Sequence, residues 1–343
     1  MDERKKRVLS AIINDYIANG EPVGSRTITK RYDLGVSPAT IRNEMSDLTD
    51  EGYIEQPHTS AGRIPSAKGY RYYVDNLMER ERLSLAQLRE IKEALAGELT
   101  ELDNFMRSCI NMMSHLTNYP AFALVPERSR GRLENIQLVP LNDRQVLAVL
   151  LTSVGLVHHK VVELSEPVSQ SELQSIEIGL SNTLRGRELN SISEDLLREL
   201  MNELHIRERI RSQAMGLLES VLDMGGGNRV FTGGMMNMLS QPEFQDLSRL
   251  RGLVSLLEEE NNVSELLDKG AGDGPLTVTI GGEMPVESVR DCSMVVANYF
   301  INGEKAGSIG VLGPTRMSYG RTVALMEQIA GELSRALSDK EKK

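Results

Sequence analysis

The clearest pattern of apolar and polar positions lies between residues 35 and 65. Apolar residues there recur at helical spacing and form one stripe, with polar residues on the opposite face. The stripe consists of Ile41, Met45 and Leu48. Ser37 is a typical N-cap, and Pro38 suits the first helical position, where no backbone N–H is needed. The pattern predicts a helix that begins at Pro38 and is ended by Gly52.

Two further helices are predicted upstream of this one. Apolar residues at helical spacing over residues 3–18 indicate a helix that stops at Gly20. Ser25 can cap a second, short helix over residues 26–32. The turn at residues 33–36 has the length used by a helix-turn-helix, and its glycine can adopt a positive φ.

A short β-ribbon is predicted after the third helix. Residues 53–56 and 63–65 can pair as strands across a turn that contains Ser60 and Gly62. Three helices followed by such a ribbon predict a winged helix-turn-helix, a fold whose third helix fits the major groove of DNA.

The exposed face of the third helix carries side chains suited to base recognition. Arginine pairs with guanine, asparagine pairs with adenine, and alanine or threonine contacts the thymine methyl group. The predicted base contacts are Ala39, Thr40, Arg42, Asn43 and Ser46. Three acidic residues crowd the C-terminal half of the helix, so its N-terminal end should enter the groove. A solvated polar face would explain the helix alone, but the turn, ribbon and cap in register favour DNA binding.

Polar and basic residues around this helix are the expected phosphate contacts. Residues 59–71 contain three basic residues and no acidic one. The full predicted set is Ser25, Arg26, Lys30, Ser37, Ser60, Arg63, Lys68 and Arg71. The net charge of −10 does not oppose this, because residues 1–75 hold 11 basic and 11 acidic residues and the whole excess lies beyond them. Phosphate contact depends on local charge.

The rest of the chain predicts an α+β protein. Residues 80–118 predict one or two helices, and residues 134–164 predict three antiparallel strands. The remaining predicted strands are 121–124, 229–232, 276–280, 294–300 and 307–311. The remaining predicted helices are 170–184, 193–203, 205–223, 242–259 and one from near Thr315 or Ser318 to Leu337. One α+β domain is thus interrupted by another.

The string PVGSRTITKRY…VSPATIRNEMSDLTDEGYIEQPHTSAGRIPSAKGYRYYVD resembles the signature of the HrcA family, the bacterial heat-inducible repressors of chaperone operons. The match runs without a gap from about Pro22 to Asp75, and it includes exposed polar residues as well as core spacing. It continues more loosely through NYPAFALVP (118–126) and GSIGVLGPTRMSYGRTVALM (307–326).

The resemblance implies a homodimeric repressor of heat-shock operons that binds double-stranded DNA at an inverted repeat of the CIRCE type. It also implies a GroEL-type chaperonin as a partner that keeps the repressor active. The domains expected are a winged helix-turn-helix at 1–78, a split GAF-like domain at 79–129 and 226–343, and an inserted dimerising domain at 130–225.

No catalytic, metal or cofactor site is predicted. The five histidines and two cysteines have no zinc-ligand spacing, and the glycines at 225–227 are not followed by the remainder of a phosphate-binding loop. Two cysteines imply no disulfide framework. With no signal peptide or membrane span in the sequence, we expect a cytoplasmic, nucleoid-associated protein.

Two alternatives to the heat-shock repressor remain open. The GAF-like domain could sense a small metabolite, in which case a tight ligand would co-purify. An enzyme with a winged-helix head would need a nucleotide-binding loop, and we find none in the sequence.

Overall fold

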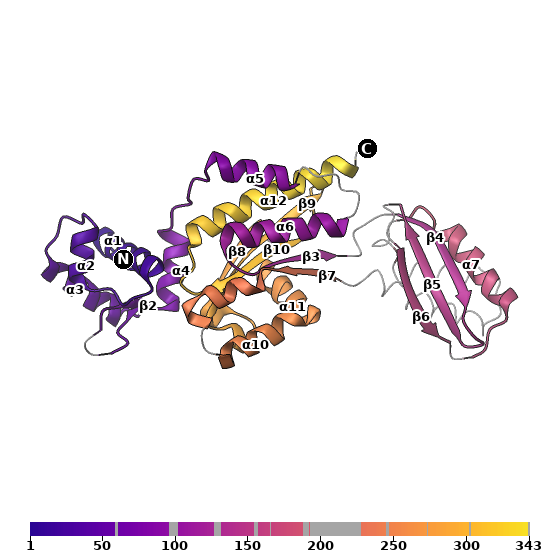
Figure 1. Ribbon diagram of the computed structural model, residues 1–343, viewed down its shortest axis with the longest axis horizontal. Coiled ribbons are helices and arrows are strands. Elements are labelled where there is room, and N and C mark those ends of the chain that lie inside the picture. The colour runs from indigo at the N-terminus through magenta and orange to yellow at the C-terminus, as the bar shows by residue number, and fades with distance from the viewer. Residues whose placement is uncertain are drawn as a thin grey trace. The chain divides into compact units, whose positions relative to one another are not determined.

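A computed structural model of the chain forms two compact units (Figure 1). The first comprises residues 1–124 and 230–343, and the second comprises residues 125–229. The structure describes residues 1–58, 61–95, 102–126, 132–153, 157–164, 166–187, 192, 228–244, 247–272, 274–301 and 303–341. Within the first unit we call residues 1–78 the head, and the remainder the body.

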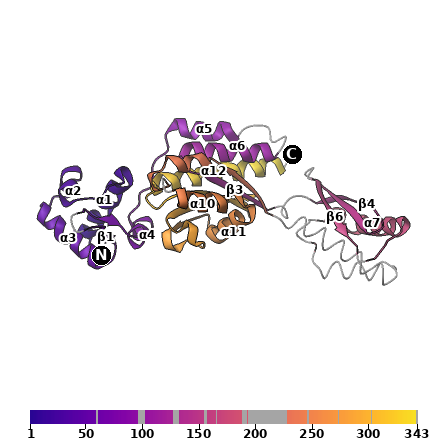
Figure 2. The same ribbon diagram turned by 60° about the horizontal axis from the view of Figure 1, so that its bottom comes forward.

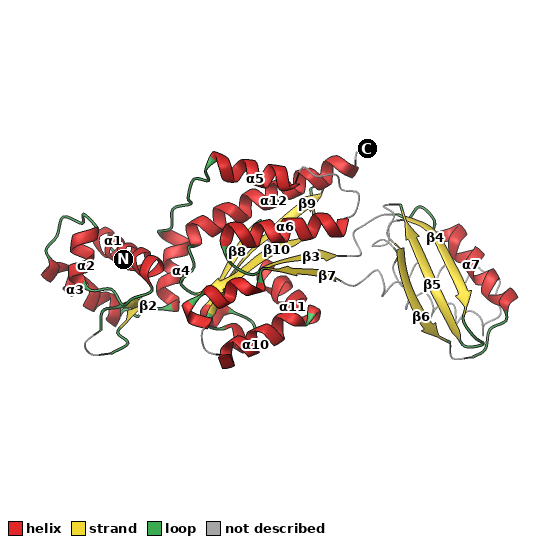
Figure 3. Cartoon of the chain, in the orientation of Figure 1, coloured by secondary structure: helices red, strands yellow, loops and turns green. Residues whose placement is uncertain are grey.

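The described residues of the head form four helices and a two-stranded antiparallel ribbon (Figure 3). In chain order its elements are α1 (Glu3–Asn19), α2 (Ser25–Arg31), α3 (Pro38–Asp50), β1 (Ile54–Glu55), β2 (Ile64–Pro65) and α4 (Ala67–Asn76). The predicted cap of α3 is confirmed, because Ser37 Oγ accepts a hydrogen bond from the Thr40 N–H. Gly35 has a φ of 68°, as the predicted turn requires.

The predicted cap of α2 is wrong by one residue. The helix begins at Ser25 itself, and Gly24 occupies the N-cap position with an extended backbone and no side-chain hydrogen bond. Glycine is tolerated at the N-cap position, so the helix can begin one residue earlier than predicted, with Ser25 in its first turn. There the Ser25 carbonyl oxygen accepts a hydrogen bond from Thr29 Oγ1.

Apolar residues of the three predicted helices meet in one core. The stripe of α3 is buried, as predicted, and α1 contributes the largest share of side chains. The fully buried residues of this core are Val8, Leu9, Ile12, Ile13, Ile28, Ile41, Leu48 and Ile54.

Close backbone contacts lock the ribbon to the rest of the head. Val23 and Arg63 exchange both backbone hydrogen bonds, at 2.8 and 2.9 Å. At Gly69 in α4, a Cβ atom would overlap the Tyr53 carbonyl oxygen. The helix can therefore approach the ribbon this closely only with glycine at position 69.

The body is a sheet covered by helices on both sides. Its described strands lie in the order β7 (Asn228–Gly233), β3 (Ala121–Pro126), β10 (Glu304–Pro314), β9 (Cys292–Ile301) and β8 (Leu276–Ile280). Figures 1 and 2 show α5 (Leu85–Leu95), α6 (Leu102–Thr117) and α12 (Tyr319–Glu341) on one side, with α10 (Leu247–Glu258) and α11 (Glu260–Ala271) on the other. The described part of the body also contains four short 3₁₀ helices: η3 (Met235–Ser240), η4 (Pro242–Phe244), η5 (Gly281–Glu283) and η6 (Glu287–Val289).

Strands from distant parts of the sequence are neighbours in this sheet. The chain leaves the body through β3 and returns through β7, which lies beside β3. On its other edge, β3 pairs with β10 in antiparallel register, with Phe122 opposite Gly310. The second unit is thus inserted between two adjacent strands.

The second unit contains the predicted three-stranded meander. Strands β4 (Leu133–Pro140), β5 (Gln145–Thr152) and β6 (Val157–Glu163) pair antiparallel in sequence order. Helix α7 (Gln170–Leu184) packs against β4, where Glu177 Oε2 accepts a hydrogen bond from the Leu138 N–H. The predicted helices at 193–203 and 205–223 lie outside the described residues.

Two body helices differ from their predictions. The segment predicted as one helix over 242–259 is a short 3₁₀ turn, then α10, and a further helix α11 follows it. The apolar spacing of Val263, Leu266 and Leu267 in α11 is helical, and all three are buried. The last helix extends to Glu341, beyond the predicted end at Leu337. Among the described helices, none has both the length and the apolar character needed to cross a membrane.

We expect Gly69→Ala to lower the melting temperature of the head, because the added methyl group forces α4 away from Tyr53. Overpacking of this kind destabilises by about 1–3 kcal/mol. The matched control is Gly331→Ala in α12, where a Cβ atom has nothing within 4 Å. Thermal unfolding followed by circular dichroism should separate the two variants, and equal melting temperatures would contradict the close approach.

Candidate nucleic-acid interface

Helix α3 presents one polar face to solvent and buries the other. Ala39, Arg42, Asn43 and Ser46 are exposed, whereas Ile41 and its apolar neighbours are buried. Thr40 is half-buried, and its hydroxyl lies 3.0 Å from Ser37 Oγ in the N-terminal cap. The predicted base-contact residues thus share one accessible helix face, apart from Thr40, which belongs to the cap.

The acidic residues near the C-terminal end of α3 are partly neutralised by α1. Lys5 Nζ lies 2.8 Å from Glu51 Oε1 and 3.1 Å from Asp47 Oδ2. The hydrogen bonds to Glu51 and Asp47 raise the pKa of Lys5. The repulsion of phosphate expected from these two carboxylates is therefore weaker than the sequence suggests.

Two buried carboxylates, which sequence reasoning missed, join α1 to the other helices. Arg31 Nη1 lies 2.6 Å from Asp15 Oδ1, and Arg4 Nε lies 2.5 Å from Glu44 Oε1. Both carboxylate side chains are 6% exposed. Their sequence signal was weak, since each acid occupies a helical position next to an apolar stripe and reads as an ordinary surface residue.

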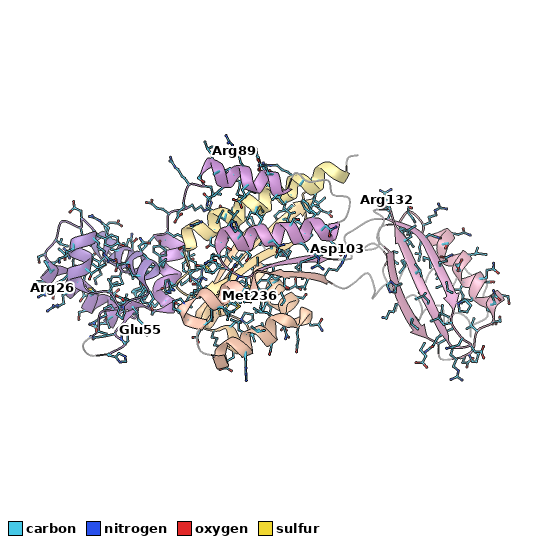
Figure 4. All side chains as sticks on the ribbon, viewed as in Figure 1. Arg26, Glu55, Arg89, Asp103, Arg132 and Met236 are labelled. Atoms are coloured by element: carbon cyan, nitrogen blue, oxygen red, sulfur yellow. The ribbon has the colours of Figure 1, made fainter. Side chains whose placement is uncertain are left out.

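Two exposed cations lie on α2, the helix that precedes α3. Arg26, which Figure 4 labels, is exposed. Lys30 is also exposed, and Ser25 is half-buried. Together with Arg42 they place positive charge on α2 and α3. Ser60, predicted as a phosphate contact, lies outside the described residues.

The predicted phosphate contacts Arg63, Lys68 and Arg71, which lie in or just after the ribbon, all have partners within the chain. Arg63 Nε donates to Thr49 Oγ1 at 3.0 Å. Lys68 Nζ donates to the Glu51 carbonyl oxygen at 2.8 Å and lies 4.5 Å from the centre of the Tyr53 ring. Lys68 is exposed and Arg63 is half-buried, so their side chains remain accessible from solvent.

Arg71 is directed elsewhere, toward the body. Its Nε donates to Glu283 Oε1 at 2.8 Å, its Nη2 donates to the Val278 carbonyl oxygen at 2.6 Å, and its Nη1 donates to Asp75 at 3.1 Å. These bonds use every nitrogen of the guanidinium. The structure therefore separates Arg71 from the other residues predicted to contact phosphate.

The body carries two cysteines and a cavity with acidic residues in its lining. No cluster of three or more potential metal ligands occurs among the described residues. Both cysteines are buried and form no disulfide, and burial raises the pKa of each thiol to about 12. A cavity of about 260 Å³ has Glu243, Glu287 and Asp291 among its lining residues.

Comparison with known proteins identifies close relatives across the whole chain. The family model described as "HrcA protein C terminal domain" matches residues 103–323. The heat-inducible transcription repressor HrcA of Pelotomaculum thermopropionicum is 43% identical over 337 residues, which cover 98% of this chain and 97% of the relative. The protein of that name from Moorella thermoacetica is 41% identical, with 98% of each chain covered.

One solved structure is similar over its full length. The crystal structure of a hypothetical protein superposes with a TM-score of 0.62 at 25% sequence identity, covering 99% of both chains.

Proposed function

The chain belongs to the HrcA family, and we propose that it represses transcription as a homodimer bound through its heads to an inverted-repeat operator. The family consists of transcription repressors and not of enzymes. The observation that carries the proposal is the accessible polar face of α3 at Ala39, Arg42, Asn43 and Ser46. An exposed arginine and asparagine within five residues of the first helical residue, Pro38, suit base recognition in the major groove.

In this proposal the head is a winged helix-turn-helix, with α3 as the reading helix and the β1–β2 ribbon as the wing. Thr40 contributes at the N-terminal end of the face. We propose phosphate contacts from Ser25, Arg26, Lys30, Ser37, Arg63 and Lys68. Arg71 is left out because all three of its nitrogens already have partners, two of which belong to the body.

We propose that residues 79–129 and 226–343 form a GAF-like domain and that residues 130–225 form a dimerising domain. The sheet of the second unit supports the second assignment. Val139 and Val161 are 40% and 51% exposed, and both are register partners of half-buried Leu147. Three apolar residues in a row across the sheet form a surface that a second copy would cover.

The family resemblance also supports a GroEL-type chaperonin as a partner. The fold adds a physical reason, because β3 can form its hydrogen bonds only after the distant strands β7 and β10 have been brought beside it. Long-range pairing of this kind folds slowly and exposes apolar surface meanwhile. The concentration of folded dimer would then fall on heating and relieve repression, and no ligand would be needed.

Metabolite sensing remains the alternative function. The cavity beside Glu243 could admit a small molecule. Mass spectrometry of the purified protein under non-denaturing conditions tests this, since a sensor would carry a bound ligand.

We expect Arg42→Ala and Asn43→Ala each to weaken operator binding by about 1–3 kcal/mol, with little effect on random DNA, because base contacts carry specificity. The matched control is Arg26→Ala, an exposed arginine of α2 that we assign to phosphate. Its loss should weaken binding to both DNAs and reduce the salt slope by roughly one. Fluorescence anisotropy over a range of salt concentrations measures all three, and equal losses on both DNAs for Arg42→Ala would contradict base reading.

We expect Val161→Asp to convert the dimer into monomers, because it buries a charge in the proposed seam. The control is Ile178→Asp, which makes the same kind of change at a side chain of α7 that is 55% exposed. Sedimentation velocity at micromolar concentration distinguishes the two. A dimeric Val161→Asp protein would place the seam elsewhere.

We expect chaperonin with ATP to raise the yield of operator-binding protein several-fold after dilution from denaturant. The reason is the late completion of the body sheet. Chaperonin without ATP serves as the control. Complete refolding without chaperonin would contradict the folding-based mechanism and favour metabolite sensing.

A further inference from the structure

Two features of the chain have no role in the proposed DNA contacts. One is Arg71, which bonds the body instead of facing the solvent. The other is the segment GPTRMSYG at residues 313–320, part of the C-terminal string that resembles the HrcA family. In the structure both belong to the contact between head and body.

Arg71 forms the first point of this contact. Two of its nitrogens bond the Glu283 carboxylate, and one of them also bonds the Val278 carbonyl oxygen. Burial alone would raise the pKa of Glu283, but hydrogen bonds from Arg71 and from the Ile280 N–H lower it. A guanidinium paired at two points with a carboxylate restricts orientation as well as distance.

Arg316 forms the second point, at the end of α1. Its Nη1 donates to the Ile17 carbonyl oxygen at 3.3 Å, and its other nitrogens bond the Glu243 carboxylate. The last carbonyl groups of a helix lack partners within the helix and attract positive charge. Gly20 ends α1 beside this guanidinium, where a Cβ atom would lie 3.7 Å from Nε.

An aromatic contact and a backbone hydrogen bond add to this contact between head and body. The ring centres of Tyr70 in α4 and Tyr319 in α12 are 5.8 Å apart, and both residues are buried. The Glu81 N–H donates to the Gly320 carbonyl oxygen at 3.3 Å, just after the head ends. Helix α1, helix α4 and the segment after the head therefore all contact the body. Most of these contacts involve residues 316–320, and that of Arg71 involves Glu283.

We propose that Arg71 and Arg316 are positioning residues that seat the head on the body and thereby set the half-site spacing that the dimer accepts. This inference rests on the proposed function, in which two heads bind one inverted repeat. An exposed ion pair alone contributes little, but two arginines with carbonyl and aromatic contacts restrict rotation about more than one axis.

Spacing is a sensitive measure of this restriction. Adding one base pair between half-sites moves them apart by about 3.4 Å and rotates one against the other by roughly 35°. Two heads held rigidly on their bodies can bind both half-sites only over a narrow range of spacings. Heads on a flexible connection can bind both half-sites over a wide range of spacings.

The first experiment uses full-length protein and inverted repeats whose central spacer varies one base pair at a time. We expect the wild type to prefer its best spacing over neighbouring spacings by about tenfold or more, since linked sites bind well only when the geometry matches. Arg71→Ala/Arg316→Ala should flatten this preference and leave binding to a single half-site unchanged. The control is Arg335→Ala, which removes an exposed arginine that pairs with Glu332 of the same helix. A double variant with the wild-type spacing preference overturns the proposal.

A second measurement does not depend on DNA. Spin labels at Glu55→Cys in the head and Lys269→Cys in the body report the head–body distance, because both native cysteines are buried. Mixing the labelled protein with an excess of unlabelled protein leaves one labelled subunit in most dimers, so that distances between labels on different subunits are not measured. We expect a narrow distribution in the wild type and in Arg335→Ala, and a broad one in Arg71→Ala/Arg316→Ala. Equal widths overturn the seating.

Exchanging the charges of Arg71 and Glu283 distinguishes a loss of head positioning from general damage to the fold. Glu283→Arg should broaden the distance distribution, because it opposes Arg71, and Arg71→Glu/Glu283→Arg should narrow it again. Failure of the exchanged pair to restore the distribution counts against the proposal. If the wild type shows no preference for inverted repeats, the proposed function fails, and the spin-label distances still decide whether the arginines seat the head.

Discussion

The body depends on the pairing of β3 with strands that follow it by more than a hundred residues. Residues 121–125 are almost fully buried, and β3 has β10 on one edge and β7 on the other. Without these neighbours its backbone groups would lack partners in the core. Because β3 fixes the register of β10 through the pair Phe122–Gly310, it also fixes where the segment after Pro314 emerges. The seat of the head is built on that segment.

The charge balance of the head is explained by where its acids lie. A neutral sum over residues 1–75 looks unsuited to DNA, yet several carboxylates are engaged internally. Asp15 and Glu44 are buried against arginines, and Lys5 bonds Asp47 and Glu51. These pairs hold α1 against α2 and α3. The cations of α2 and α3 that face solvent are thus less opposed than a simple count of charges implies.

Local signals in the sequence predicted the helices of the head well, because caps and apolar stripes act within a few residues. Ser37 and the buried stripe of α3 are examples. Contacts between distant segments were not predictable in this way. Arg71 reads as a surface cation until Glu283, 212 residues away, is seen beside it. Similarly, the need for glycine at position 69 is evident only once Tyr53 is in place.

The burial of both sulfhydryl groups has a consequence for the kinds of stress the protein can register. Reaction of a cysteine with peroxide or with another thiol requires an accessible thiolate. Cys109 and Cys292 are enclosed, and their high pKa keeps them protonated at neutral pH. Oxidants therefore have no accessible cysteine through which to alter the folded protein.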